Sequence, residues 1–178
     1  MGGRNPAVKL LYHAPPEAWV RAARELDAEQ RWTYPVEDGK LWRGLGRKSQ
    51  AGAAKLGGGP RGPRRRPHAG LDIAAPAGTP IRAAQSGIVV YSDNELSGYG
   101  NLVIVVHGDG SVALYGHCRA TYVFPGQYVS KGVVIGEVGT TGYANGAHLH
   151  FEYRVRGRPR DPSKLFDQPL KAATSKRR

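Results

Sequence analysis

The chain has 178 residues, and its 26 Lys and Arg against 14 Asp and Glu give a formal net charge of +12. This length accommodates one ordinary domain with extensions, and a hydrophobic content of 40% excludes a wholly disordered chain. A single cysteine excludes a disulfide framework and a zinc site built from four cysteines. The longest uncharged apolar run, Leu102–Val106, is far too short to cross a bilayer, so no transmembrane segment is expected.

Residues 1–31 are expected to form an N-terminal helical extension. Two prolines at 15 and 16 suit a helix start, and Glu17 suits the first turn. Apolar residues then recur at helical spacing from Val20 to Leu26. No signal peptide is visible in this segment, because no apolar stretch of the right length follows its first basic residues.

The positive charge lies in two flanks. Residues 32–67 hold nine basic and two acidic residues, and residues 151–178 hold nine and three. The segment between them, 68–150, holds three and five and is slightly acidic. Basic flanks of this kind fit three interpretations: a solvated basic surface, a contact with nucleic acid, or attraction to an anionic polymer such as a bacterial cell wall.

The first flank contains a basic loop, and the chain ends in a basic tail. Residues 47–67 are mostly Gly, Pro, Arg and Lys, which is typical of an exposed loop. Residues 167–178 are expected to form the C-terminal tail. No aromatic residues interleave with Arg64, Arg65 and Arg66, so the loop lacks a platform for stacking nucleic-acid bases.

The segment between the flanks is expected to be mainly β. Runs of apolar and β-branched residues bounded by glycines predict strands at 86–92, 102–106, 112–115, 133–138 and 148–155. The Gly-Asp-Gly turn at 108–110 predicts a hairpin between the second and third of these. Short strands joined by close turns fit an antiparallel two-sheet sandwich or a barrel-sandwich core, with no helix between Leu71 and Val155.

Two pairs of residues in this segment could converge on a metal ion. His148 and His150 are two apart on an expected strand, so their side chains share a face. His68 and Asp72 are four apart, and Gly70 between them permits the bend that would bring both to one ion. Each pair alone is a weak signal, because such spacings also arise by chance.

His117 completes the set, since it follows an expected strand end. Two histidines and one aspartate would bind zinc through three protein ligands and leave a fourth position for water, as in catalytic sites. The remaining two histidines would then serve as acid–base groups. Strand geometry leaves open which of His148 and His150 is the ligand.

Five motifs in order and spacing resemble the lysostaphin-type (LytM-like) zinc metalloendopeptidases, whose fold is the duplicated hybrid motif. The motifs are HAGLD (68–72), GYGNLVIVVHGDG (98–110), LYGH (114–117), VSKGVVIGEVGTTG (129–142) and HLHFE (148–152). Weaker likeness extends upstream to 34–36 and 44–46, near the family's opening strand, and downstream to 159–165. The resemblance implies a metallopeptidase domain over 32–166 that hydrolyses peptide cross-links of bacterial peptidoglycan through a metal-activated water.

The same resemblance implies a role for each residue. His68, Asp72 and His150 would bind one Zn²⁺ per chain. His148 would face the attacking water, and His117 would polarise the scissile amide or stabilise the developing oxyanion. With peptidoglycan as the substrate, the protein would act in the cell envelope, in the periplasm or outside the cell.

Two departures from the family pattern stand out. Cys118 takes the place of a plain apolar residue, and strand alternation predicts that its thiol points away from His117 into packing. The other departure is the basic loop, whose residues Arg64, Arg65 and Arg66 could contact anionic cell-wall polymer.

Three other functions compete with the endopeptidase. A catalytically silent domain of the same fold would bind or regulate without cutting, although all five key positions are filled here. A basic nucleic-acid-binding protein would explain the net charge but not the histidines. A lipoyl or biotinyl carrier domain ranks last, because Lys131 does not lie at a hairpin tip.

Overall fold

The computed structural model describes residues 17, 20, 32–46, 67–166 and 171–172. The expected N-terminal helix, most of the basic loop and most of the tail lie outside the described residues, so these expectations stay predictions. Within the described part of the chain, no helix has the length and apolar character needed to cross a membrane.

The described residues form a β structure with one turn of 3₁₀ helix at Pro162–Lys164. The strands are β1 (Lys40–Arg43), β2 (Leu71–Ala74), β3 (Pro80–Arg82), β4 (Gly87–Asp93), β5 (Asn101–Val106), β6 (Ser111–Thr121), β7 (Tyr128–Val129), β8 (Val134–Val138), β9 (His148–Val155) and β10 (Arg158–Arg160). The mainly β prediction is therefore confirmed, and so is the absence of helix between Leu71 and Val155.

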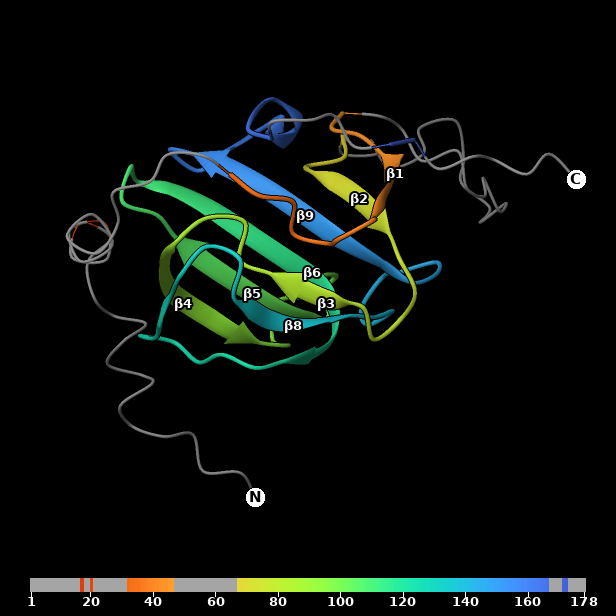
Figure 1. Cartoon of the computed structure of the whole chain (residues 1–178), viewed down its shortest axis with the longest axis horizontal. Helices are drawn as coiled ribbons and strands as arrows, with labels where there is room; N and C mark the ends of the chain where they lie inside the picture. The colour runs from red at the N-terminus through yellow and green to blue at the C-terminus, as the bar shows by residue number, and fades with distance from the viewer. Residues whose placement is uncertain (1–16, 18–19, 21–31, 47–66, 167–170, 173–178) are drawn as a thin grey trace, which may run out of the picture.

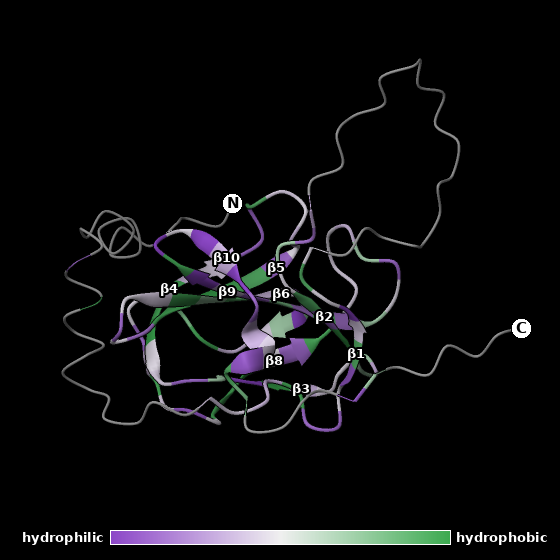
Figure 2. Ribbon diagram, turned by 90° about the horizontal axis from the view of Figure 1, so that it is seen from above, coloured by the Kyte–Doolittle hydropathy of each residue, from purple (hydrophilic) through white to green (hydrophobic). Residues whose placement is uncertain are grey.

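The strands form two layers. The main sheet has the order β1-β2-β9-β6-β5-β4-β7, and every pairing between the named strands is antiparallel. The β3–β8 pair branches from the end of β6 and lies over one face of this sheet (Figure 1). Seen from above, β3 and β8 run below the layer that contains β4, β5, β6 and β9 (Figure 2).

The hydrophobic core fills the space between the layers. Fully buried side chains come from both of them, including Ile81 on β3, Ile135 on β8, Tyr115 on β6 and Phe151 on β9. The Tyr115 hydroxyl accepts a hydrogen bond from the Ala84 backbone N–H at 2.9 Å, so its polar end is satisfied inside the core. Because side chains alternate along a strand, the even-numbered residues of β9 face away from this core.

Two strands differ from the sequence-based expectation by more than a residue. The first strand is Lys40–Arg43, which lies between the two segments that resembled the family's opening strand. The third expected strand does not end at Tyr115 but continues to Thr121. It continues because β6 changes partners: it pairs with β9 up to Gly116 and with β8 from Cys118 onward.

Packing between the layers predicts that truncating a buried residue of β8 lowers the free energy of unfolding more than truncating the exposed residue just before this strand. Ile135 is 1% exposed, so Ile135→Ala should lower the free energy of unfolding by about 2 to 5 kcal/mol through lost burial and a cavity. Val133 is 43% exposed, so Val133→Ala should change it by less than about 0.5 kcal/mol. Urea unfolding of both variants measures the difference, and equal values would contradict a core between the layers.

Candidate metal and catalytic site

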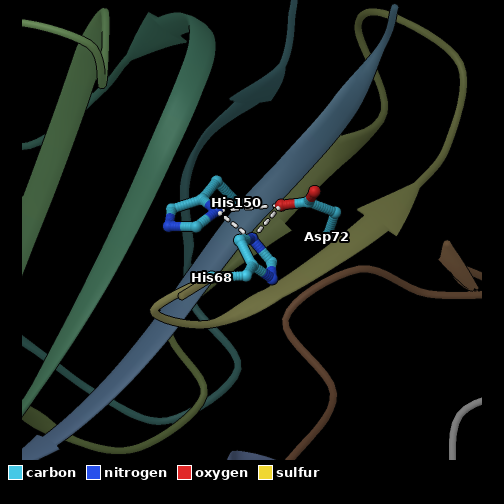
Figure 3. Close-up of side chains that lie close together, drawn as sticks. All are labelled: His68, Asp72 and His150. Carbon is cyan, nitrogen blue, oxygen red and sulfur yellow. Dashed lines mark hydrogen bonds and ion pairs between the residues drawn. The ribbon is translucent and has the colours of Figure 1, made fainter. Parts of the chain in front are cut away.

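The sheet register brings the candidate residues together on the face of β9 that points away from the core. Asp72 on β2 lies directly opposite His150 on β9, and Gly116 on β6 lies opposite His150 on the other side. His68 precedes β2 and folds back over this pair (Figure 3). The side chains of His68, Asp72 and His150 are all buried.

Gly70 allows this fold-back by its small size. A Cβ atom at position 70 would lie 2.3 Å from the Phe151 carbonyl oxygen, closer than real contacts allow. The sequence indicated glycine for a bend, whereas the structure shows that glycine is needed for close approach between the turn and β9.

Three ligand-type atoms converge at the centre of the site. Asp72 Oδ1 lies 2.9 Å from His68 Nε2 and 2.8 Å from His150 Nδ1, and the two nitrogens are 3.2 Å apart. These residues form the one group in the described part of the chain that could hold a metal ion.

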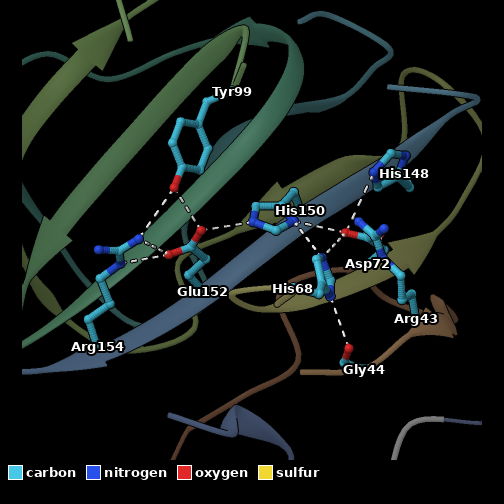
Figure 4. A network of polar contacts seen from close by, with 9 residues as sticks. All are labelled: Arg43, Gly44, His68, Asp72, Tyr99, His148, His150, Glu152 and Arg154. Carbon is cyan, nitrogen blue, oxygen red and sulfur yellow. Dashed lines mark hydrogen bonds and ion pairs between the residues drawn. The ribbon is translucent and has the colours of Figure 1, made fainter. Parts of the chain in front are cut away.

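The outward-facing atom of each of these three residues has a fixed partner (Figure 4). His68 Nδ1 donates to the Gly44 carbonyl oxygen at 3.0 Å. His150 Nε2 donates to Glu152 Oε1 at 2.9 Å. Asp72 Oδ2 pairs with Arg43 Nε at 2.7 Å. Because both outer nitrogens carry their protons, each neutral imidazole directs a lone pair at the centre.

Converging lone pairs require a positive charge between them. Burial raises the pKa of the Asp72 carboxyl. When protons rather than a metal ion lie between these atoms, His150 and His68 donate hydrogen bonds to Asp72, and these outweigh burial and bring the pKa well below its usual range. Burial lowers the pKa of His150, and the contacts with Asp72 and Glu152 outweigh it and raise that pKa. The site therefore attracts a cation, which is a proton or a metal ion.

The residues fit zinc. Two imidazoles and one carboxylate form a ligand set that zinc uses in catalytic sites. At zinc–ligand distances of about 2.0–2.1 Å, ligand atoms of a tetrahedral site lie about 3.3 Å apart. The observed separations of 2.8–3.2 Å come close to that spacing.

His117 and His148 lie beside this group. Their rings are 4.8 Å apart between centroids, and His148 Nε2 is 3.7 Å from Asp72 Oδ1. Backbone carbonyls fix the Nδ1 proton of each ring, since Thr141 accepts from His117 and Gly146 accepts from His148, both at 2.8 Å. Each neutral ring therefore has a bare Nε2 that can accept a proton.

Burial keeps both of these histidines neutral. It lowers the pKa of His117 to about 4, with the neighbouring His148 adding to the effect. It also lowers the pKa of His148, although the hydrogen bond to Gly146 acts in the opposite direction. Both are therefore available as proton acceptors at neutral pH.

A strained backbone places His117 in the site. Its φ of +62° is in the left-handed region, where a side chain other than that of glycine is disfavoured. Thr141 supports this conformation twice: its carbonyl accepts from the ring, and its hydroxyl donates to the Cys118 carbonyl at 2.8 Å. The Asn101 amide also donates to the Cys118 carbonyl, at 3.0 Å.

The neighbouring thiol takes no part in the site. Cys118 is 1% exposed and belongs to the core cluster, so the prediction that it points away from His117 is confirmed. Burial raises the pKa of the Cys118 thiol to about 12, which removes the thiolate needed for nucleophilic attack.

Sequence reasoning missed the residues that surround the ligands. Glu152 is 1% exposed, and besides His150 it accepts hydrogen bonds from Tyr99 at 2.8 Å and Arg154 at 2.6 Å (Figure 4). Strand alternation could have found Glu152, because it shares a face with His150. Arg43 and Tyr99 gave no such signal, since their positions depend on pairing between distant segments.

The segment that contains the candidate site matches one known protein family. Residues 66–162 match the profile of peptidase family M23. A "DD-carboxypeptidase/endopeptidase Mpg" from Neisseria meningitidis is 44% identical over 95 residues, which cover 53% of this chain and 22% of that protein. A "Lipoprotein NlpD/LppB homolog" from Pseudomonas aeruginosa is 47% identical over 93 residues, covering 52% and 31%. The chain thus spans less than a third of either relative.

Solved structures share the fold. Lysostaphin from Staphylococcus simulans superposes with a TM-score of 0.63 at 26% identity, covering 79% of this chain and 54% of that one. A zinc-containing peptidase from Vibrio cholerae also gives 0.63, at 30% identity, covering 80% and 41%. The lysostaphin-type resemblance proposed from the motifs is therefore confirmed.

The lowered pKa of His117 predicts a distinct titration. In zinc-free protein its ring should stay neutral on acidification until about pH 4, whereas unfolded-chain histidines titrate near 6.5. Because the folded pKa is the lower one, the contribution of His117 to stability is full above about pH 6.5 and is lost as the pH falls toward 4. NMR titration measures this pKa, with the urea-unfolded chain as control, and a folded value near 6.5 would contradict the prediction.

Proposed function

Because the chain belongs to peptidase family M23, we propose that it is a zinc-dependent endopeptidase that hydrolyses peptide cross-links of bacterial peptidoglycan. One observation carries the proposal: the fold gathers His68, Asp72 and His150 into a group suited to a metal, and places two neutral histidines beside it. A relative named as an endopeptidase supports the reaction class.

His68, Asp72 and His150 would hold the zinc ion. When bound, zinc supplies a Lewis acid that makes water a nucleophile near neutral pH and polarises the amide carbonyl. Arg43 Nε pairs with the outer oxygen of Asp72, so Oδ1 is the oxygen that would bind the ion.

We assign the removal of a proton from the attacking water to His148. Its Nε2 is bare and lies 3.7 Å from Asp72 Oδ1, so it is close to the atoms that would bind the metal. As the water oxygen bonds to the carbonyl carbon, the proton passes to His148 Nε2. The same nitrogen then returns the proton to the leaving amine as the carbon–nitrogen bond breaks.

His117 has a different role, because it can donate from Nε2 only after that atom takes up a proton. Burial opposes protonation in the resting site. Negative charge that develops on the carbonyl oxygen of the substrate favours protonation of His117. We assign to His117 the uptake of a proton from solvent at Nε2 as the oxyanion forms, and its return to solvent once the carbon–nitrogen bond has broken. His117 then donates to the oxyanion in the transition state rather than in the ground state, and an interaction made only in the transition state accelerates the reaction.

Peptidoglycan as substrate implies action in the cell envelope. The relative from Pseudomonas aeruginosa is named as a lipoprotein, which agrees with this location. The residues on either side of the basic loop lie next to each other at the site, since the Gly46 N–H donates to the His68 carbonyl at 2.8 Å. An anionic cell-wall polymer bound by Arg64, Arg65 and Arg66 would be held close to the metal ligands.

Metal content and cleavage measured together test the proposed function. Wild-type protein should bind one zinc per chain and release muropeptides from purified peptidoglycan. His148→Gln should keep the zinc and lose at least about a hundredfold in rate, because general acid–base catalysis is removed. His150→Ala should lose both, whereas His13→Ala, at a position with no assigned role, should lose neither. Elemental analysis and chromatography of the released fragments provide the measurements.

Each other outcome favours a named alternative. Zinc bound without cleavage in the wild type points to a silent binding or regulatory domain of the same fold. No zinc and no cleavage contradicts the proposal, and salt-dependent DNA binding that survives His150→Ala would then favour a nucleic-acid-binding protein.

The basic loop is tested by neutralising it. Replacing Arg64, Arg65 and Arg66 together by glutamine should weaken binding to purified sacculi at low salt and have little effect at high salt, because screening already removes the attraction there. A variant with the exposed β10 residues Arg158 and Arg160 replaced by glutamine is the control for lower net charge. Unchanged sacculus binding in the loop variant would contradict a contact with the cell wall.

A further inference from the structure

We propose that Tyr99, Glu152 and Arg154 form a positioning triad that orients His150 and sets the affinity of the site for zinc. The inference rests on the proposed function, because it assumes that His150 binds the metal. The side chains of Glu152 and Tyr99 contact His150, so the role of the triad is to act through that residue.

The triad is a closed set of contacts around one buried carboxylate. Glu152 Oε1 accepts from His150 Nε2 at 2.9 Å and from the Tyr99 hydroxyl at 2.8 Å. Glu152 Oε2 accepts from Arg154 Nε and from its terminal nitrogen, each at 2.6 Å. That terminal nitrogen also donates to the Tyr99 oxygen at 3.3 Å, which closes the ring (Figure 4).

These contacts leave Glu152 no freedom to turn. Both oxygens are occupied, and the side chain is 1% exposed, so no water competes for them. Arg154 neutralises a charge whose burial would otherwise be costly. A fixed carboxylate holds a proton of His150 on Nε2, so Nδ1 is the atom that turns toward Asp72 and His68 and would bind the metal.

The backbone provides space for the triad. A Cβ atom at Gly116 would lie 3.3 Å from Tyr99 Cδ1, tighter than most real contacts. Glycine at this position therefore lets the Tyr99 ring lie against β6 and reach across to β9. The Tyr99 and His150 rings lie 5.8 Å apart between centroids.

The protein carries a second group of the same residue types, which serves as a control. Tyr122 donates to Glu137 Oε1 at 2.5 Å, and Arg119 Nε lies 3.8 Å from Glu137 Oε2. This group is at the surface, with 66% of the Arg119 side chain exposed, and it contacts no histidine among the described residues. The same substitutions can therefore be made with and without an adjacent metal ligand.

The experiment measures zinc affinity of the full chain by competition with a chromophoric chelator. Glu152→Gln should weaken zinc binding about 10- to 100-fold, because the glutamine amide cannot accept from both His150 and Arg154. Tyr99→Phe should weaken it by a smaller factor, through the loss of one contact. Glu137→Gln and Tyr122→Phe should leave the affinity unchanged.

A second readout separates positioning from a general loss of structure. With Co²⁺ in place of zinc, the visible absorption should shift in Glu152→Gln and not in Glu137→Gln, since it reports the ligand geometry. Thermal unfolding of the zinc-free variants shows which are folded. If Glu152→Gln does not fold, Tyr99→Phe decides the outcome.

The results distinguish this inference from the proposed function. Wild-type protein that binds no zinc contradicts the proposed function. Wild-type protein that binds zinc and cleaves, with unchanged affinity and cobalt spectrum in both folded site variants, overturns the triad alone.

Discussion

The structure depends on one constraint, the convergence of three lone pairs within 3.2 Å at Asp72, His68 and His150. Such an arrangement is repulsive unless a cation occupies its centre. The rigid sheet imposes it, because β2 and β9 pair with Asp72 directly opposite His150. Folding energy from the core therefore holds together a group of atoms that would separate if they were free.

The surrounding polar contacts all maintain this convergence. Each carboxylate of the network has its own arginine, since Arg43 pairs with Asp72 and Arg154 pairs with Glu152. These pairs cancel the two negative charges, so a divalent ion in the site would keep its own charge. A net positive centre suits a reaction in which negative charge develops on an amide oxygen.

Local pattern was sufficient for the parts of the fold that depend on neighbouring residues. Alternation predicted β9 with its histidines on one face, and the Gly-Asp-Gly turn predicted the β5–β6 hairpin; both are present in the structure. Pattern could not separate ligand from acid–base roles for His148 and His150, and the proposed assignment of these roles comes from the family resemblance. It also missed the continuation of β6, because the change of partner at Gly116 depends on segments distant in sequence. For the same reason, Arg43 and Tyr99 could not be assigned to the site before the fold was known.

The most direct test of the central claim is a crystal structure of the protein grown with zinc, with anomalous diffraction measured at the zinc absorption edge. The account predicts one anomalous peak, bound by His68 Nε2, Asp72 Oδ1 and His150 Nδ1, with Nε2 of His117 and His148 facing it. A peak bound through His148 in place of His150, or no peak at this group, would contradict the account.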